Sequence, residues 1–138
     1  MIHFYDKNRN IVMKLFDFSF SEQEEPRIKF SSIISYSFYK ASREIEDYKI
    51  CLEAFLKELN LLYENKIEIA KFVPLERQLE IYFRKLEFGQ ISVSIRLNNV
   101  DFDNFTHNLY ESKLEINYEI DQSFLPELID EISTVISS

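Results

Sequence analysis

Residues 79–97 read LEIYFRKLEFGQISVSIRL, and this stretch decides the fold because it predicts a β-hairpin. Apolar and polar residues alternate on both sides of a short central turn, which is typical of two strands with one buried face. Both apolar rows reach the same face if the turn contains three residues, 87–89. Gly89 then occupies the turn position that needs a left-handed backbone, and Glu80 lies opposite Arg96, which predicts an ion pair between the strands.

Two amphipathic helices are predicted, one before this hairpin and one at the end of the chain. Leucine and aromatic residues at helical spacing predict a helix over residues 47–64, with Asp47 as its N-cap and Asn65 as its left-handed end. The last helix has two possible N-caps, Asp121 and Ser123, because either one leaves the proline of this segment at or near the first turn. Each helix has a single apolar stripe, so each is expected to cover a sheet.

The other predicted strands are less regular. In residues 11–19 the apolar positions change face near Leu15 and Phe16, which predicts a β-bulge or a strand covered on both faces. One long strand is predicted over residues 27–39, whereas residues 98–108 are predicted to form a polar loop. Further strands are predicted at 2–5, 66–73 and 108–120.

These elements predict one α+β domain over residues 1–138. The expected fold class is a single antiparallel sheet of about six to seven strands, with two helices packed on one face. A chain of this length buries a sizeable core without needing a disulfide or a metal ion.

The composition excludes several kinds of site. One glycine cannot build a glycine-rich phosphate loop or a nucleophile elbow, and one cysteine cannot form an intrachain disulfide or a two-cysteine zinc site. Cys51 lies on the apolar side of the first predicted helix, where a small buried hydrophobe is more common than a reactive thiol. We therefore predict no catalytic residue and no cofactor, and nothing in the sequence is specific for an enzyme.

One segment begins like a calcium-binding loop. Asp101, Asp103 and Asn104 have the spacing of its first ligands, but Thr106 replaces the required glycine and Ser112 replaces the final glutamate. The two histidines have no partner at metal-ligand spacing, so each is expected to lie at the surface or to be hydrogen-bonded. No metal site is predicted.

The sequence also indicates a location. The first residues lack the positive start and long apolar run of a signal peptide, and no apolar stretch is long enough to span a membrane. A lone cysteine is typical of a reducing compartment. A cytoplasmic protein with no membrane partner is expected.

Charge is unevenly distributed along the chain. The net charge is −8, and residues 97–138, with nine acids and one base, carry all of it. No nucleic-acid partner is expected, because phosphates attract basic surfaces. An acidic surface instead attracts a basic protein partner and speeds association, although a solvated face that keeps the protein soluble explains the same pattern. The predicted binding residues on this surface are Asp101, Asp103, Glu111, Glu115 and Glu119.

A second candidate binding surface lies on the long predicted strand. Ser35, Ser37 and Tyr39 alternate with apolar residues and are expected to share its outer face. Tyrosine and serine together make adaptable contacts at low entropic cost. An ordinary exposed sheet face explains the same pattern.

The end of the chain resembles a known family. Residues 114–125, LEINYEIDQSFL, are similar to the junction of strand, D-Q-S, aromatic residue and leucine in the WapI-type bacterial immunity proteins. The order of elements is similar too, with LNLLY at 59–63, a strand bearing Glu80, and GQISV at 89–93, so that the resemblance covers roughly residues 30–136. It implies a small bacterial protein that binds and neutralises a cognate protein toxin, which is a basic nuclease if it acts on nucleic acid.

Two other classes of function remain open at this point. The first is a small ligand-binding or enzymatic α+β domain with a pocket between the sheet and the helices. The second is an adaptor protein that forms a homodimer through an edge strand or through the serine and tyrosine face. The sequence allows either a monomer or a homodimer.

Overall fold

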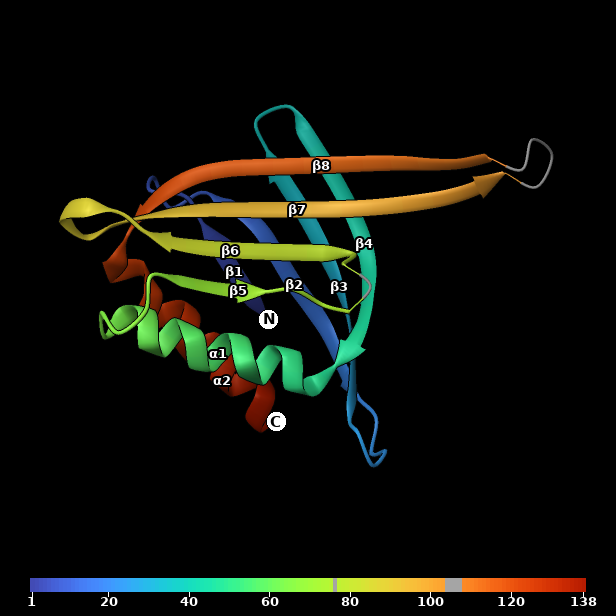
Figure 1. The fold of residues 1–138 in the computed structure, drawn as a ribbon, viewed down its shortest axis with the longest axis horizontal. Helices are drawn as coiled ribbons and strands as arrows, with labels where there is room; N and C mark the ends of the chain where they lie inside the picture. The colour runs from blue at the N-terminus through green and yellow to red at the C-terminus, as the bar shows by residue number, and fades with distance from the viewer. Residues whose placement is uncertain (76, 104–107) are drawn as a thin grey trace.

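The computed structural model of the protein describes residues 1–75, 77–103 and 108–138, with the side chains of 1–75, 77–99 and 112–138. In these residues, two four-stranded antiparallel sheets and two helices form the fold (Figure 1). Strands that follow one another in the chain are neighbours within each sheet. The first sheet contains β1 (Ile2–Tyr5), β2 (Ile11–Phe20), β3 (Arg27–Tyr36) and β4 (Tyr39–Tyr48), and the second contains β5 (Ile69–Phe72), β6 (Leu79–Lys85), β7 (Gln90–Asp103) and β8 (Asn108–Asp121). The helices are α1 (Lys49–Tyr63) and α2 (Leu125–Ser137), with short 3₁₀ turns η1 (Glu87–Gly89) and η2 (Gln122–Phe124).

The predicted single sheet is wrong, because the strands divide into two sheets. The helix α1 connects β4 of the first sheet to β5 of the second. The sheets pack against each other, with α1 along β5 and α2 along β1 (Figure 1). The strands present more apolar surface than two helices can cover, so the sheets bury much of it against one another.

Aromatic side chains join the two sheets at the centre of the molecule. Phe30 of β3 contacts Phe72 of β5, with ring centroids 6.4 Å apart, and Phe4 of β1 lies 6.2 Å from Phe83 of β6. Phe55 of α1 contacts both Phe72 and Phe83. The core is therefore continuous from one sheet to the other and into α1.

The strand β4 was not predicted. The expected long strand at 27–39 ends at Tyr36, where a two-residue turn with a positive φ at Ser37 reverses the chain. Half of the ten residues of β4 are charged, so it lacks the apolar alternation that identifies a strand. Asp47, expected as a helix cap, is buried in this strand, and Tyr48 precedes α1 without a side-chain cap.

The hairpin that decides the fold has the predicted register. Glu80 pairs with Arg96, and Gly89 has a φ of +75° in the three-residue turn. The predicted bulge in β2 is also confirmed, because the register shifts after Phe16, where Asp17 has a φ of 56°. Short-range patterns therefore predicted these local features correctly.

The end of α1 and the start of α2 both follow from local chemistry. Asn65 adopts the predicted left-handed conformation after α1, with a φ of 60°. Asp121 accepts a hydrogen bond of 2.9 Å from the backbone N–H of Ser123 and so caps η2, which leads into α2. The helix begins at Leu125, and Pro126 lies in its first turn, where the missing N–H does no harm.

The prediction of a loop over residues 98–108 is wrong for those residues of the range that the structure describes. β7 continues to Asp103 and β8 begins at Asn108, so the two strands form one long hairpin. Leu79, the first residue of β6, pairs with Leu97, and beyond this pair β7 and β8 extend past β6 (Figure 1). The polar composition of this segment does not prevent the backbone pairing of β7 with β8.

Candidate functional site

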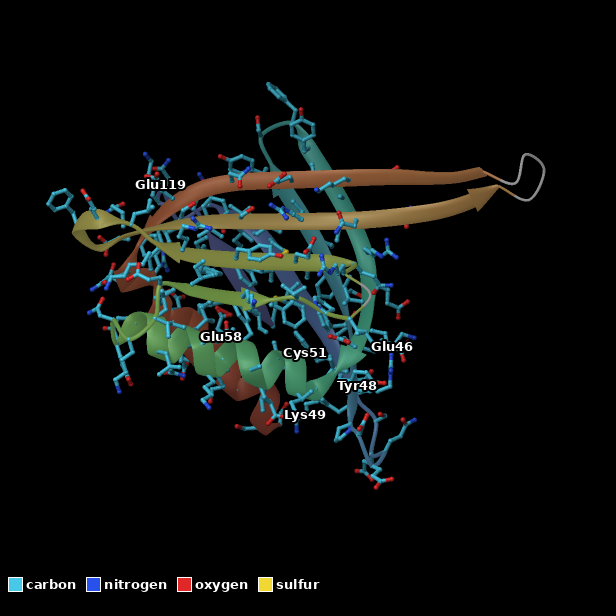
Figure 2. All side chains as sticks on the ribbon, viewed as in Figure 1. Glu46, Tyr48, Lys49, Cys51, Glu58 and Glu119 are labelled. Atoms are coloured by element: carbon cyan, nitrogen blue, oxygen red, sulfur yellow. The ribbon has the colours of Figure 1, made fainter. Side chains whose placement is uncertain are left out.

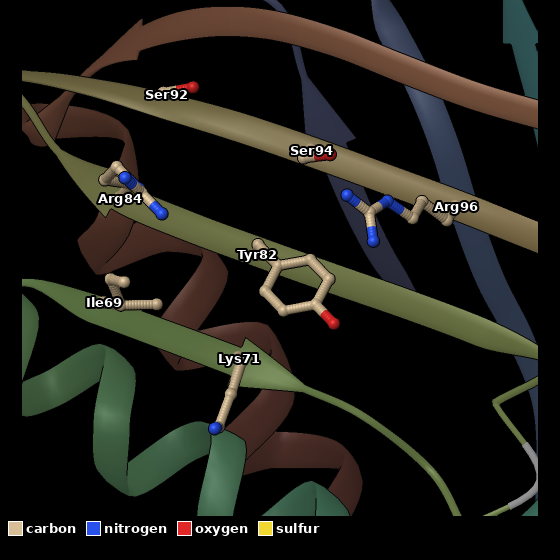
Figure 3. A pocket seen from close by; sticks show the side chains of 7 residues that line it. All are labelled: Ile69, Lys71, Tyr82, Arg84, Ser92, Ser94 and Arg96. Carbon is tan, nitrogen blue, oxygen red and sulfur yellow. The ribbon is translucent and has the colours of Figure 1, made fainter.

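The outer face of the second sheet carries a groove of about 450 Å³ (Figure 3). Its floor contains the small residues Ser92 and Ser94 of β7, and larger side chains from β6 and β7 rise around them. Figure 3 shows Arg84 and Arg96 reaching toward each other from opposite ends, with Tyr82 between them. The groove is lined by Ile69, Lys71, Tyr82, Arg84, Ser92, Ser94 and Arg96.

The groove is basic although the protein is acidic. Three cations line it, and no carboxylate does so among the side chains that the structure describes. Arg96 forms an ion pair of 3.1 Å with Glu115 on the neighbouring strand β8. Among the described side chains, Arg84 and Lys71 have no ion-pair partner. These two cations are therefore available to an anionic group from outside.

Hydrogen bonds fix the groove wall beside Arg96. The Tyr82 hydroxyl donates to the buried carboxylate of Glu80 at 2.9 Å, and the Asn98 amide donates to the same carboxylate at 3.1 Å. Burial and this hydrogen bond raise the pKa of Tyr82, so it remains a neutral donor. Arg96 lies over the Tyr82 ring and pairs with Glu115, so the ion pair predicted between Glu80 and Arg96 is replaced by these contacts. The polar groups of this wall are therefore already paired with one another.

The acidic residues predicted to bind a partner lie on β7 and β8. Glu115 and Glu119 are four residues apart on β8 and both are exposed, with Glu119 at the end nearest the β6–β7 turn (Figure 2). Arg96 donates a hydrogen bond to Glu115 and holds its pKa below the usual value, so Glu115 is ionised at neutral pH. Asp101 and Asp103 lie in β7 and Glu111 in β8, but their side chains are outside the described ones.

The second predicted surface is divided by the hairpin between β3 and β4. Ser35 pairs with Lys40 and is exposed on the outer face, Ser37 lies in the turn, and Tyr39 begins β4. Tyr39 occupies a position of the opposite face, because it directly precedes Lys40 in the strand and pairs with Tyr36 rather than with Ser35. The expected shared face of Ser35, Ser37 and Tyr39 is therefore wrong, although all three lie at one exposed hairpin tip.

A second cavity of about 390 Å³ joins this tip to β8. It is lined by Tyr39 and Lys40 on one side and by Ser112 and Lys113 on the other. Of the residues predicted to bind a partner, Tyr39 lines this cavity, and none of the five acidic ones is among its described lining residues.

Other candidate residues have structural contacts. Burial and a hydrogen bond with Asp47 raise the pKa of Cys51 to about 11, which keeps the thiol protonated and supports the prediction of an unreactive cysteine (Figure 2). His3 is hydrogen-bonded as expected, with its Nδ1 atom 2.7 Å from Glu131 of α2. His107 lies outside the described residues, and no group of three or more metal-ligating side chains occurs among those that are described.

The space between the sheets and the helices is occupied by side chains. A cavity among β1, β6, β8 and α2 measures about 20 Å³, which is close to the minimum for one water molecule. This cavity is far smaller than a pocket for a small-molecule ligand, whereas a larger one of about 420 Å³ lies at the surface where β4 leads into α1. Neither of the described helices has the length and apolar content required to cross a membrane.

The basic groove was missed by sequence reasoning. The alternation in the hairpin correctly predicted that Tyr82, Arg84 and Arg96 lie on the face away from the core, but it did not predict a groove there. One feature of the sequence could have indicated the groove. In the predicted register Arg84 lies opposite the small residue Ser92, so a large basic side chain stands beside a low position on the sheet. Lys71 could not be predicted as part of the groove, because the sequence carries no comparable signal for the pairing of β5 with β6.

Comparison with known proteins identifies the family. A family model described as the immunity protein WapI-like family matches residues 52–138, which contain most of α1, the whole second sheet and α2. No curated protein and no solved structure matches the chain. The match covers more than half of the sequence and includes the segment 114–125 that carried the resemblance. The chain therefore belongs to the WapI-like immunity protein family.

Proposed function

We propose that the protein neutralises a cognate toxin by binding it through an acidic surface at β8. The family match over residues 52–138 carries this proposal, because an immunity role requires a partner and the matched segment contains the open outer face of the second sheet. Glu115 and Glu119 are exposed at the edge strand of that face. If the toxin acts on nucleic acid, its active site must be basic to hold phosphates, and this acidic row complements it.

The continuation of β7 and β8 past β6 supports the same surface. Asp101, Asp103 and Glu111 lie on this extended hairpin, and Glu115 and Glu119 follow on β8, so all five acids of the proposed surface lie on β7 and β8 (Figure 1). Fixed charges on a projecting element increase the rate of association with a partner of opposite charge. We propose that the protein acts in the cytoplasm, where Cys51 stays reduced.

The test uses the C-terminal domain of the protein encoded directly upstream as the toxin. Co-expression of the wild-type chain is expected to restore growth, and the purified proteins are expected to bind. The double variant Glu115→Lys with Glu119→Lys is expected to weaken binding by about tenfold or more, mainly through slower association. Surface plasmon resonance at two salt concentrations measures both rates.

The matched control reverses two charges on the other sheet. Glu44 and Glu46 are exposed on β4, so Glu44→Lys with Glu46→Lys changes the net charge equally. This control should retain affinity within about twofold. Unchanged affinity of the β8 variant would refute the acidic surface, whereas failure of the wild-type chain to bind or protect would refute the immunity role toward that toxin.

A further inference from the structure

The basic groove and the acidic row occupy different strands of one sheet face. Lys71 lies on β5, Arg84 on β6 and Arg96 on β7, whereas Glu115 and Glu119 lie on β8. The face is therefore positive on one side and negative on the other, with the Arg96–Glu115 ion pair at the boundary. A partner that complements both halves can bind in only one orientation, since the reversed orientation would place like charges together.

An exposed aromatic residue lies at one end of this face. Phe88 is 94% exposed at the tip of the β6–β7 turn, next to the strand ends that carry Arg84 and Ser92. Its φ of 58° and ψ of 35° lie in the left-handed region, which is costly for a bulky side chain. A strained backbone that presents a large apolar side chain to solvent is a feature that binding sites retain, because buried aromatic anchors dominate interface energy.

We propose that the groove and Phe88 together form the part of the toxin-binding face that receives an acidic, protruding segment of the toxin. Arg84 and Lys71 lack ion-pair partners among the described side chains and donate hydrogen bonds to carboxylates of that segment, and Phe88 enters an apolar pocket beside it. The concave shape favours a protruding partner, and the small serines of the floor allow its close approach. This inference rests on the proposed function and adds the chemistry of the partner.

Binding of the upstream-encoded toxin domain by calorimetry tests the proposal. Arg84→Glu with Lys71→Glu is expected to weaken binding at least tenfold, and Phe88→Ala is expected to do the same. Two matched controls lie elsewhere on the chain: Lys29→Glu with Lys40→Glu changes two exposed cations on the outer face of the first sheet, and Phe38→Ala removes a phenylalanine that is 97% exposed at the β3–β4 tip. Each control should change affinity less than twofold, and thermal melting checks that every variant is folded.

The outcomes separate this inference from the proposed function. If the wild-type chain binds the toxin but the groove and Phe88 variants bind equally well, the inference is wrong and the immunity role stands. If Phe38→Ala weakens binding instead, the β3–β4 tip is the anchor and the inference is also wrong. If light scattering shows that the wild-type chain is a dimer and that Phe88→Ala makes it a monomer, the face binds a second copy and the inference is overturned. If the wild-type chain does not bind the toxin, the proposed function fails.

Discussion

Charged side chains are arranged differently on the outer faces of the two sheets. On the first sheet, Lys29 pairs with Glu44 at 3.0 Å and Arg27 pairs with Glu46 at 3.2 Å, so that cations of β3 are matched by acids of β4. On the second sheet, Arg84 and Lys71 have no such partner among the described side chains. Charges that are already paired gain little from a partner, whereas an unpaired cation can form a new ion pair that offsets the cost of its desolvation. Lys14 and Lys40 on the outer face of the first sheet also have no ion-pair partner among the described side chains, so what distinguishes Arg84 and Lys71 is that they line one groove together.

The family match follows the same division. It begins at residue 52 and includes the second sheet, whereas the first sheet lies outside it. The shared aromatic core nevertheless joins the two sheets, so we expect them to unfold together.

The largest expected effect tests whether the two sheets form one cooperative domain. Phe72 is 1% exposed and contacts both Phe30 of the first sheet and Phe55 of α1, so Phe72→Ala leaves a cavity between the sheets. We expect a loss of about 3–5 kcal/mol in the free energy of unfolding. Amide hydrogen exchange should show that β3 and β7 lose protection together. Loss of protection in only one sheet would show two independent units, and the exposed Phe38→Ala is the control.

The same division appears in what sequence patterns could predict. The β6–β7 hairpin was predicted with its register, because its apolar alternation is regular and Gly89 marks the turn. In the first sheet, the long strand was not divided at Ser37, since a turn with a positive φ at serine carries no glycine signal. The separation into two sheets could not be predicted, because it depends on which apolar faces meet across long distances in the chain.

Binding residues were predictable only in part for a related reason. Sequence alternation shows that Arg84 and Arg96 point outward, but not that Arg96 selects Glu115 and leaves Arg84 unpaired. That choice depends on the order of strands across the sheet. The acidic character of residues 97–138 was visible directly, because it is a property of composition.

A smaller effect is expected from the strained turn of the second sheet. Asparagine tolerates the left-handed region better than phenylalanine does, so Phe88→Asn should raise the free energy of unfolding by about 1 kcal/mol. Urea denaturation measures this change. Phe38 is equally exposed at the β3–β4 tip but has no positive φ, so Phe38→Asn should give no such gain. Equal gains would show that lost apolar exposure, rather than backbone strain, explains the result.

A pH-dependent effect is expected where the second sheet leads into α2. The backbone N–H of Ser123 donates to Asp121 and lowers the pKa of its carboxyl group in the folded state. The stabilisation is therefore present above the unfolded pKa of about 3.9 and is lost as the pH falls through the lower folded value. Asp121→Ala should reduce the melting temperature by a few degrees at pH 7, and by progressively less toward pH 3. Asp130→Ala, which removes another exposed carboxylate near the same end of the chain, is the control. A deficit of Asp121→Ala that stays constant from pH 7 to pH 3 would contradict the capping role.

The smallest effect concerns one ion pair from each sheet. Lys29–Glu44 and Arg96–Glu115 have similar lengths of 3.0 and 3.1 Å, but the first pair is 54% and 62% exposed and the second is 35% and 37% exposed. Solvent screens the more exposed pair more strongly, and arginine is held in place by the Tyr82 ring as well. Double-mutant cycles with glutamine at each position should therefore resolve a small coupling for Arg96–Glu115 and none for Lys29–Glu44, in melting temperatures measured at low salt.

If both couplings vanish, Arg96 is as available to a partner as Arg84 is, and the positive half of the binding face extends to β7. If both persist equally, exposure does not distinguish the two faces, and only the unpaired cations Arg84 and Lys71 do.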